Sequence, residues 1–119
     1  MHNPTQHSPY IFDCDTDNFQ QRVIAASATQ PVLVDFSADW CGPCRILAPV
    51  LHRLIPEYNG KVLLANIDAD ENMKLCGHYR LRGFPTVILF VNGEEIARFS
   101  GARSVVETRH FIDEHLQAK

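Results

Sequence analysis

A short segment that is apolar on both faces constrains the fold of this chain more than any other feature. Residues 31–37 read PVLVDFS, and Asp35 is the only charged residue in the run. A strand with one face in solvent alternates apolar and polar side chains, whereas a strand buried between two layers is apolar throughout. The segment therefore predicts a central strand of a sheet that is covered on both sides.

Helical and strand-like segments alternate on either side of this strand. A helix is expected over 16–27, capped by Thr16 or Asp17, and its apolar stripe is Phe19, Val23 and Ala26. Further helices are expected over 41–54, over 71–79 and after the capping box that starts at Ser104. Further strands are expected over 61–68 and at an edge of the sheet near 10–12. Residues 83–101 are expected to form a hairpin of two strands that turns at Asn92-Gly93.

This order predicts an α/β fold with a central mixed sheet of four to five strands flanked by about four helices. Residues 10–119 are expected to form a single domain, because 119 residues is an ordinary domain size. Residues 1–9, with two prolines and polar neighbours, are expected to be a loose N-terminal leader.

Charge and hydropathy narrow the function classes. The net charge is −3, and the sequence has no basic stripe, so neither nucleic acid nor an anionic membrane surface is an expected partner. No run approaches the roughly 18 apolar residues of a membrane span, and the start lacks the pattern of a signal peptide. Four cysteines are too few for a disulfide framework in a chain of this length, so a reducing, cytoplasmic location is expected.

The two central cysteines stand where the buried strand passes into the next helix, in the sequence WCGPC. Unsatisfied N–H groups and the helix dipole stabilise a thiolate at a helix start, where Cys41 lies. Cys44 is three residues on, on the same face of the first turn. The pair is therefore expected to form a reversible disulfide, with the more exposed Cys41 attacking a target and Cys44 resolving the mixed disulfide.

Asp35 is the second chemically unusual residue. Burial disfavours the charged form of a carboxyl group, so its pKa is expected to rise toward neutrality. A carboxylate beneath the cysteines would be able to take the proton from Cys44. The other interpretation is that Asp35 is a satisfied core residue with no kinetic role.

Several motifs together resemble the thioredoxin family: WCGPC preceded by VDF, then GFPT, then VNGE and SGA. The resemblance extends from about Phe19 to Leu116. It implies a thioredoxin fold and a protein-disulfide reductase with Cys41 as nucleophile, Cys44 as resolving thiol and Asp35 as buried acid/base. It further implies a cis bond before Pro85 and a substrate-binding surface made of Trp40, Gly42, Pro43, Phe84, Pro85, Gly101 and Ala102.

The same resemblance implies how the protein is supplied with electrons. No cofactor would be bound to the chain, and a separate flavoprotein, thioredoxin reductase, would bring electrons from NADPH. Disulfide-containing client proteins would be the other partners, and the chain would act as a monomer in electron transport and cell redox homeostasis.

Three positions depart from the family pattern. Ser37 stands where family members usually carry a second aromatic residue, and Pro56 stands in a helix that normally continues. Leu64 is expected to occupy the place of a lysine near the buried aspartate. Without that cation, Asp35 should be harder to ionise.

Alternative interpretations of the cysteines remain open at this stage. A zinc site would need two more ligands, and Cys76 and His78 are the nearest candidates, at an unusual spacing. Another interpretation is that the Cys41–Cys44 disulfide is purely structural. Cys14 and Cys76 are expected to be buried apolar residues, with a regulatory or dimer-forming thiol as the other possibility for Cys76.

Two other functions would use the same fold. One is a thioredoxin-like domain of a redox-active co-chaperone that binds unfolded clients, suggested by residues 63–86. The other is an exported oxidant or isomerase, which would require a signal sequence.

Overall fold

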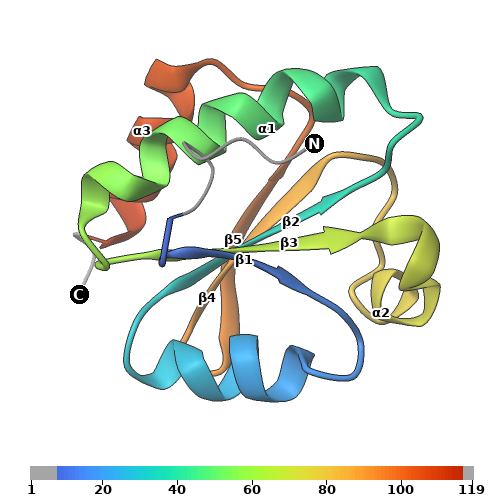
Figure 1. Ribbon diagram of the computed structural model, residues 1–119, viewed down its shortest axis with the longest axis horizontal. Coiled ribbons are helices and arrows are strands. Elements are labelled where there is room, and N and C mark those ends of the chain that lie inside the picture. The colour runs from blue at the N-terminus through green and yellow to red at the C-terminus, as the bar shows by residue number, and fades with distance from the viewer. Residues whose placement is uncertain (1–7, 117–119) are drawn as a thin grey trace.

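The computed structural model describes residues 8–116, so residues 1–7 of the expected leader and residues 117–119 lie outside the described part. A five-stranded mixed sheet forms its centre, in the order β1-β3-β2-β4-β5 (Figure 1). Its strands are β1 (Ile11–Cys14), β2 (Val32–Ser37), β3 (Leu63–Asp68), β4 (Thr86–Val91) and β5 (Glu94–Ser100). β1, β3 and β2 run parallel, β4 pairs with β2 in the antiparallel sense, and β5 pairs with β4 in the antiparallel sense.

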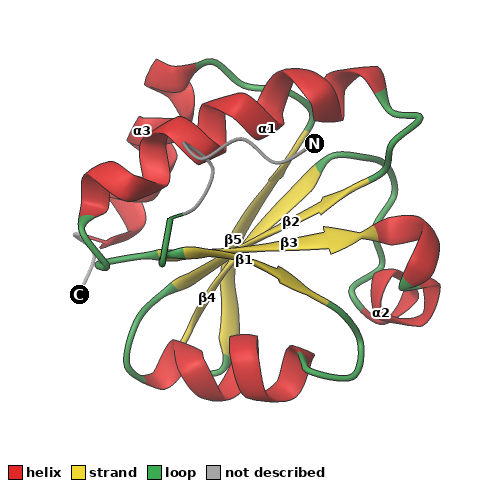
Figure 2. Cartoon of the chain, viewed as in Figure 1, coloured by secondary structure: helices red, strands yellow, loops and turns green. Residues whose placement is uncertain are grey.

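Helical segments cover both faces of this sheet (Figure 2). On one face lie α1 (Gly42–Leu54) and α3 (Val105–Leu116), which contact each other. On the other face lie η2 (Gln20–Ala25), η3 (Ala26–Ala28) and α2 (Met73–His78), while η4 (Ile55–Tyr58) extends α1 and η5 (Ala69–Glu71) precedes α2. The predicted fold class is confirmed, with five strands and four helical regions.

The central strand β2 separates two apolar cores, as its sequence predicts. Val32, Val34 and Phe36 pack with η2 and α2, whereas Leu33 packs with α1 and α3. Because side chains alternate along a strand, Asp35 lies on the same face as Leu33, toward α1.

Local signals in the second half of the chain are confirmed. The β4–β5 turn uses Asn92 and Gly93, both with positive φ. At the start of α3, the Ser104 Oγ accepts from the Glu107 N–H at 3.1 Å, and Glu107 accepts from the Ser104 N–H at 2.9 Å. These reciprocal bonds are the predicted capping box.

The first helical region differs from its prediction at both ends. It begins at Gln20 as a π-helix and ends as a 3₁₀ turn, and the residue that precedes it, Phe19, makes no side-chain cap. The expected cap at Thr16 or Asp17 is wrong, because the N-cap position is that of Phe19. The backbone N–H and hydroxyl of Thr16 both donate to Asn72 Oδ1 at 2.8 Å. A tertiary contact has replaced the local cap. The predicted stripe still faces the core, with Phe19 and Val23 buried.

Pro56 ends α1 as its position suggested. α1 stops at Leu54, and Pro56 lies within η4. Among residues 8–116, no helix is both long and apolar enough to cross a membrane.

The β4–β5 turn is tied to η3 by one buried hydroxyl. Ser27 is 2% exposed, and its Oγ donates to the Ile24 carbonyl at 2.7 Å and accepts from the Gly93 N–H at 2.8 Å. Replacement by alanine leaves that N–H without its partner. We expect Ser27→Ala to lower the free energy of unfolding by about 1–3 kcal/mol in urea titrations. Thr29→Ala, at an exposed hydroxyl, is the control, and equal losses in the two variants would contradict the assignment.

Candidate active site

Cys41 occupies the N-cap position of α1. Its backbone is extended, at φ −91° and ψ 113°, while the helix starts at Gly42. The Cys44 N–H donates to Cys41 Sγ at 3.2 Å. Since Pro43 has no N–H to offer, this bond from the first turn is one of few that the helix can make to the sulfur. The strand-to-helix transition therefore holds the sulfur where negative charge is stabilised.

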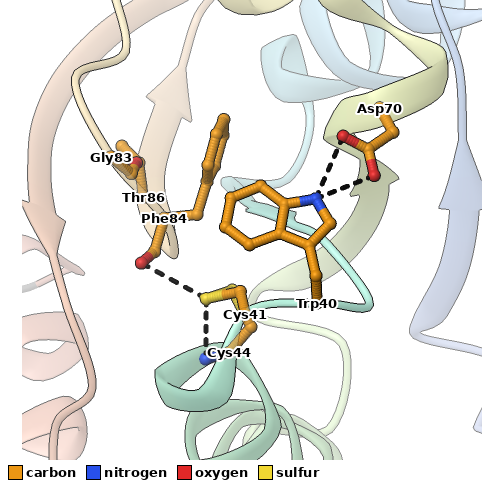
Figure 3. The surroundings of a disulfide bond; sticks show 7 residues. All are labelled: Trp40, Cys41, Cys44, Asp70, Gly83, Phe84 and Thr86. Carbon is orange, nitrogen blue, oxygen red and sulfur yellow. Dashed lines mark hydrogen bonds between the residues drawn. A yellow bond between two sulfur atoms is a disulfide. The ribbon is translucent and has the colours of Figure 1, made fainter.

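Cys44 lies three residues further along this turn and is joined to Cys41 by a disulfide, with the two Cα atoms 5.3 Å apart (Figure 3). This separation falls within the ordinary range for a disulfide. The same sulfur of Cys41 lies 3.4 Å from the carbonyl oxygen of Phe84.

The expected difference in exposure between the two cysteines is wrong for this disulfide form. Cys41 is 4% exposed and Cys44 is 3% exposed. Together with Ala38 and Phe84 they form a small apolar cluster, and Phe84 supplies the cover that the local sequence does not reveal. The two sulfurs differ instead in the N–H bond and the carbonyl contact that Cys41 receives.

The loop that contains Phe84 and Pro85, about 40 residues after the two cysteines in the sequence, faces the Cys41–Cys44 disulfide. The Phe84-Pro85 peptide bond is cis, as the family resemblance implied. The Gly101 N–H donates to the Pro85 carbonyl at 2.8 Å, and Gly101 has a φ of +87°, which a residue with a Cβ rarely adopts. The end of β5 is thereby fixed to the loop that precedes β4.

Trp40 projects from this site into solvent, with 63% of its surface exposed. Its indole N–H donates to both carboxylate oxygens of Asp70, at 2.9 and 3.2 Å, and its ring meets that of Phe84 edge to face (Figure 3). Asp70 was not predicted as a site residue, because the sequence places it 30 positions from Trp40 with no local signal. These contacts hold the ring in place at an exposed position.

The remaining predicted surface residues lie at the same end of the molecule. Gly42 and Pro43 are exposed at the start of α1, and Ala102 is exposed directly after Gly101. Pro85 is buried.

Asp35 is buried in the central strand, at 2% exposure, and its Oδ1 has no hydrogen-bond partner among the described residues. Burial raises the pKa of this carboxyl group from 3.8 to about 7. The predicted direction is confirmed. Near neutral pH the group is therefore available as either acid or base.

The strand register shows which residue of β3 lies opposite Asp35. The β2–β3 register pairs Leu64 with Leu33, and it pairs Asn66 with Asp35. Leu64 is fully buried in the apolar core under α1. Asn66 is on the same face two residues later, and its Nδ2 lies 3.4 Å from His52 Nε2 of α1. An uncharged amide thus occupies the position opposite the buried carboxyl group.

Ser37 and the two remaining cysteines are the other residues that the sequence analysis considered. Ser37 is half-buried and lines a hollow of about 420 Å³ with Ala38 and Asp39. Cys14 and Cys76 are buried free thiols, as predicted, and burial raises the pKa of Cys14 to about 11. Among residues 8–116, no group of three or more His, Cys, Asp or Glu residues is placed to hold a metal ion.

Comparison with known proteins gives the same family as the motifs. The family model described as Thioredoxin matches residues 11–114. The chain is 38% identical to a thioredoxin of Buchnera aphidicola over 106 residues, covering 89% of this chain and 96% of that one. It is 38% identical to a thioredoxin of Pseudomonas aeruginosa over 109 residues, covering 92% and 99%.

A probable thioredoxin-2 of Caenorhabditis elegans is 41% identical over 113 residues, covering 94% of this chain and 77% of that protein. Nothing in these matches favours the co-chaperone alternative. A paired CxxC at disulfide distance, on the fold that the family model describes, supports protein-disulfide reduction. The chain belongs to the thioredoxin family of thiol-disulfide oxidoreductases.

Proposed function

We propose that the two cysteines divide the reduction of protein disulfides between them, Cys41 as nucleophile and Cys44 as resolving thiol. The observation that carries this assignment is the N-cap geometry, because only Cys41 Sγ accepts an N–H bond from the first turn of α1. A sulfur in that position is the better anion and hence the better attacking group.

The exchange proceeds in two steps that move two electrons to the client. The Cys41 thiolate attacks one sulfur of the client disulfide, forms a mixed disulfide and expels the other sulfur as a thiolate, which takes a proton from water. Cys44 then loses its proton to the Asp35 carboxylate and attacks Cys41 Sγ. The second client thiolate leaves, and the protein holds the Cys41–Cys44 disulfide.

Clients dock on the surface around the dithiol. Trp40, Gly42, Pro43, Phe84, Pro85, Gly101 and Ala102 are the proposed substrate-binding residues. The exposed indole offers apolar area, and the ordered loop at Pro85 offers backbone groups to an extended client segment. These features suit many clients, since backbone and flat apolar contacts select little by sequence.

The oxidised protein must regain two electrons after each turnover. We assign this step to a flavoprotein thioredoxin reductase that draws on NADPH, with no cofactor bound to the chain itself. The protein would act as a monomer in the cytoplasm, with residues 10–119 as its domain.

Replacing either active-site cysteine tests this division of roles. In a coupled assay with NADPH, thioredoxin reductase and a disulfide-bonded protein, Cys41→Ser and Cys44→Ser should each lose about 100-fold or more in rate. Only Cys44→Ser should accumulate a client bound to Cys41, visible by non-reducing electrophoresis. Cys76→Ser, a buried thiol outside the site, is the control. Turnover at the wild-type rate in all three would contradict the proposal.

Asp35 makes stability depend on pH in a direction that can be measured. Its pKa is about 7 in the folded protein against an ordinary 3.8, so between these pH values the folded state binds more protons than the unfolded state. The free energy of unfolding should therefore fall as pH rises from about 4 to about 7, by as much as about 4 kcal/mol.

Asp35→Asn removes this contribution. In urea unfolding of the oxidised proteins, the free energy of unfolding of the variant should increase relative to that of the wild type as pH rises from 4 to 8. A constant difference between the two across this range would show that Asp35 does not titrate there. The same variant should slow the resolving step if Asp35 is the base for Cys44.

A further inference from the structure

Asp35, Asn66 and His52 are polar residues on the apolar α1 face of the sheet, and the exchange steps use only Asp35. Asp35 on β2 is directly opposite Asn66 on β3. Asn66 in turn approaches His52, which lies on α1 eight residues after Cys44. Asn66 therefore stands between the strand of the buried carboxyl group and an imidazole ring on the helix that carries the two active-site cysteines.

Within the described part of the chain, the side chains of Asp35, Asn66 and His52 form fewer hydrogen bonds than their polar atoms allow. The Asn66 Nδ2 lies 3.4 Å from His52 Nε2, and Asp35 Oδ1 has no partner. In this arrangement the amide donates and the neutral ring accepts. When His52 binds a second proton, its Nε2 becomes a donor, and only the amide oxygen of Asn66 can then accept from it. Turning the amide to present that oxygen moves Nδ2 away from the ring.

We propose that Asn66 and His52 are positioning residues for Asp35, and that a proton on His52 turns the Asn66 amide so that it donates to the Asp35 carboxylate. The amide and the ring together then supply what a fixed cation at this position would supply. Unlike a fixed cation, this support exists only while His52 is charged. The inference builds on the proposed role of Asp35 in exchange.

The other residues that flank Asp35 and Asn66 in the sheet are apolar or exposed. From β4 the neighbour is Val87, which is apolar. Asp13 of β1 lies in the same row beyond Asn66, and Asp68 follows on the same face of β3. Both of these carboxylates are exposed, so solvent screens them.

The titration of the Asp35 carboxyl carbon, followed by NMR in the reduced protein, tests the proposal directly. Asp35→Asn identifies the signal by its loss. His52→Gln should raise the midpoint by about half to one pH unit, because the carboxylate loses the hydrogen bond that the proposed turn of the Asn66 amide would donate to it. His52→Lys, which keeps a cation, should restore or lower it. Arg53→Gln is the matched control, since it removes an exposed positive charge from the next residue of α1 and should leave the midpoint in place.

The role of the amide is tested by adding Asn66→Leu. If ring and amide act through one another, the double variant His52→Gln/Asn66→Leu should titrate like either single variant. The proposal would be overturned if the midpoint shift of the double variant equalled the sum of the two single shifts. It would also be overturned if His52→Gln and Arg53→Gln had the same Asp35 midpoint. Should Asn66→Leu not fold, the His52→Gln, His52→Lys and Arg53→Gln comparison still decides it. Slow exchange in Asp35→Asn bears on the proposed proton transfer and leaves this titration result unaffected, so the two failures are distinguishable.

Discussion

The bond from the Cys44 N–H to Cys41 Sγ is the interaction on which the rest of the site depends. It exists because only four residues separate the end of β2 at Ser37 from the start of α1 at Gly42, and the last of them, Cys41, is the N-cap. The two apolar faces of β2 fix that strand at the centre of the sheet, and the buried side of α1 fixes the helix above it. The Cys41 sulfur is thus placed by packing that involves both apolar cores of the sheet.

Burial at this junction has a cost as well as a benefit. The same packing that positions the sulfur removes Asp35 from water and leaves its Oδ1 without a partner. A buried unpaired carboxyl group destabilises the folded state when it ionises. Because burial raises the pKa of this carboxyl group to about 7, the group changes its charge near neutral pH, and the stability of the fold depends on pH there.

Much of the fold follows from local patterns, because short apolar runs, turn residues and capping residues act over a few positions. The capping box at Ser104 and the Asn92-Gly93 turn are examples. What could not be predicted depends on contacts between distant segments. The pairing of Asn66 with Asp35 depends on the register of two strands. A register shift of two residues would leave every side chain on the same face, so the apolar pattern alone does not determine it. The hydrogen bond of Trp40 to Asp70 and the cover of Phe84 over Cys41 are likewise non-local.

The central claim is that the start of α1 makes Cys41, and not Cys44, the reactive thiol. The most direct measurement is the rate of alkylation of the reduced protein by iodoacetamide as a function of pH, with the modified cysteine identified by mass spectrometry. The account predicts a single adduct on Cys41, with a half-maximal rate well below the pH of about 8.5 at which an ordinary thiol ionises. Equal labelling of both cysteines with the profile of an ordinary thiol would contradict it.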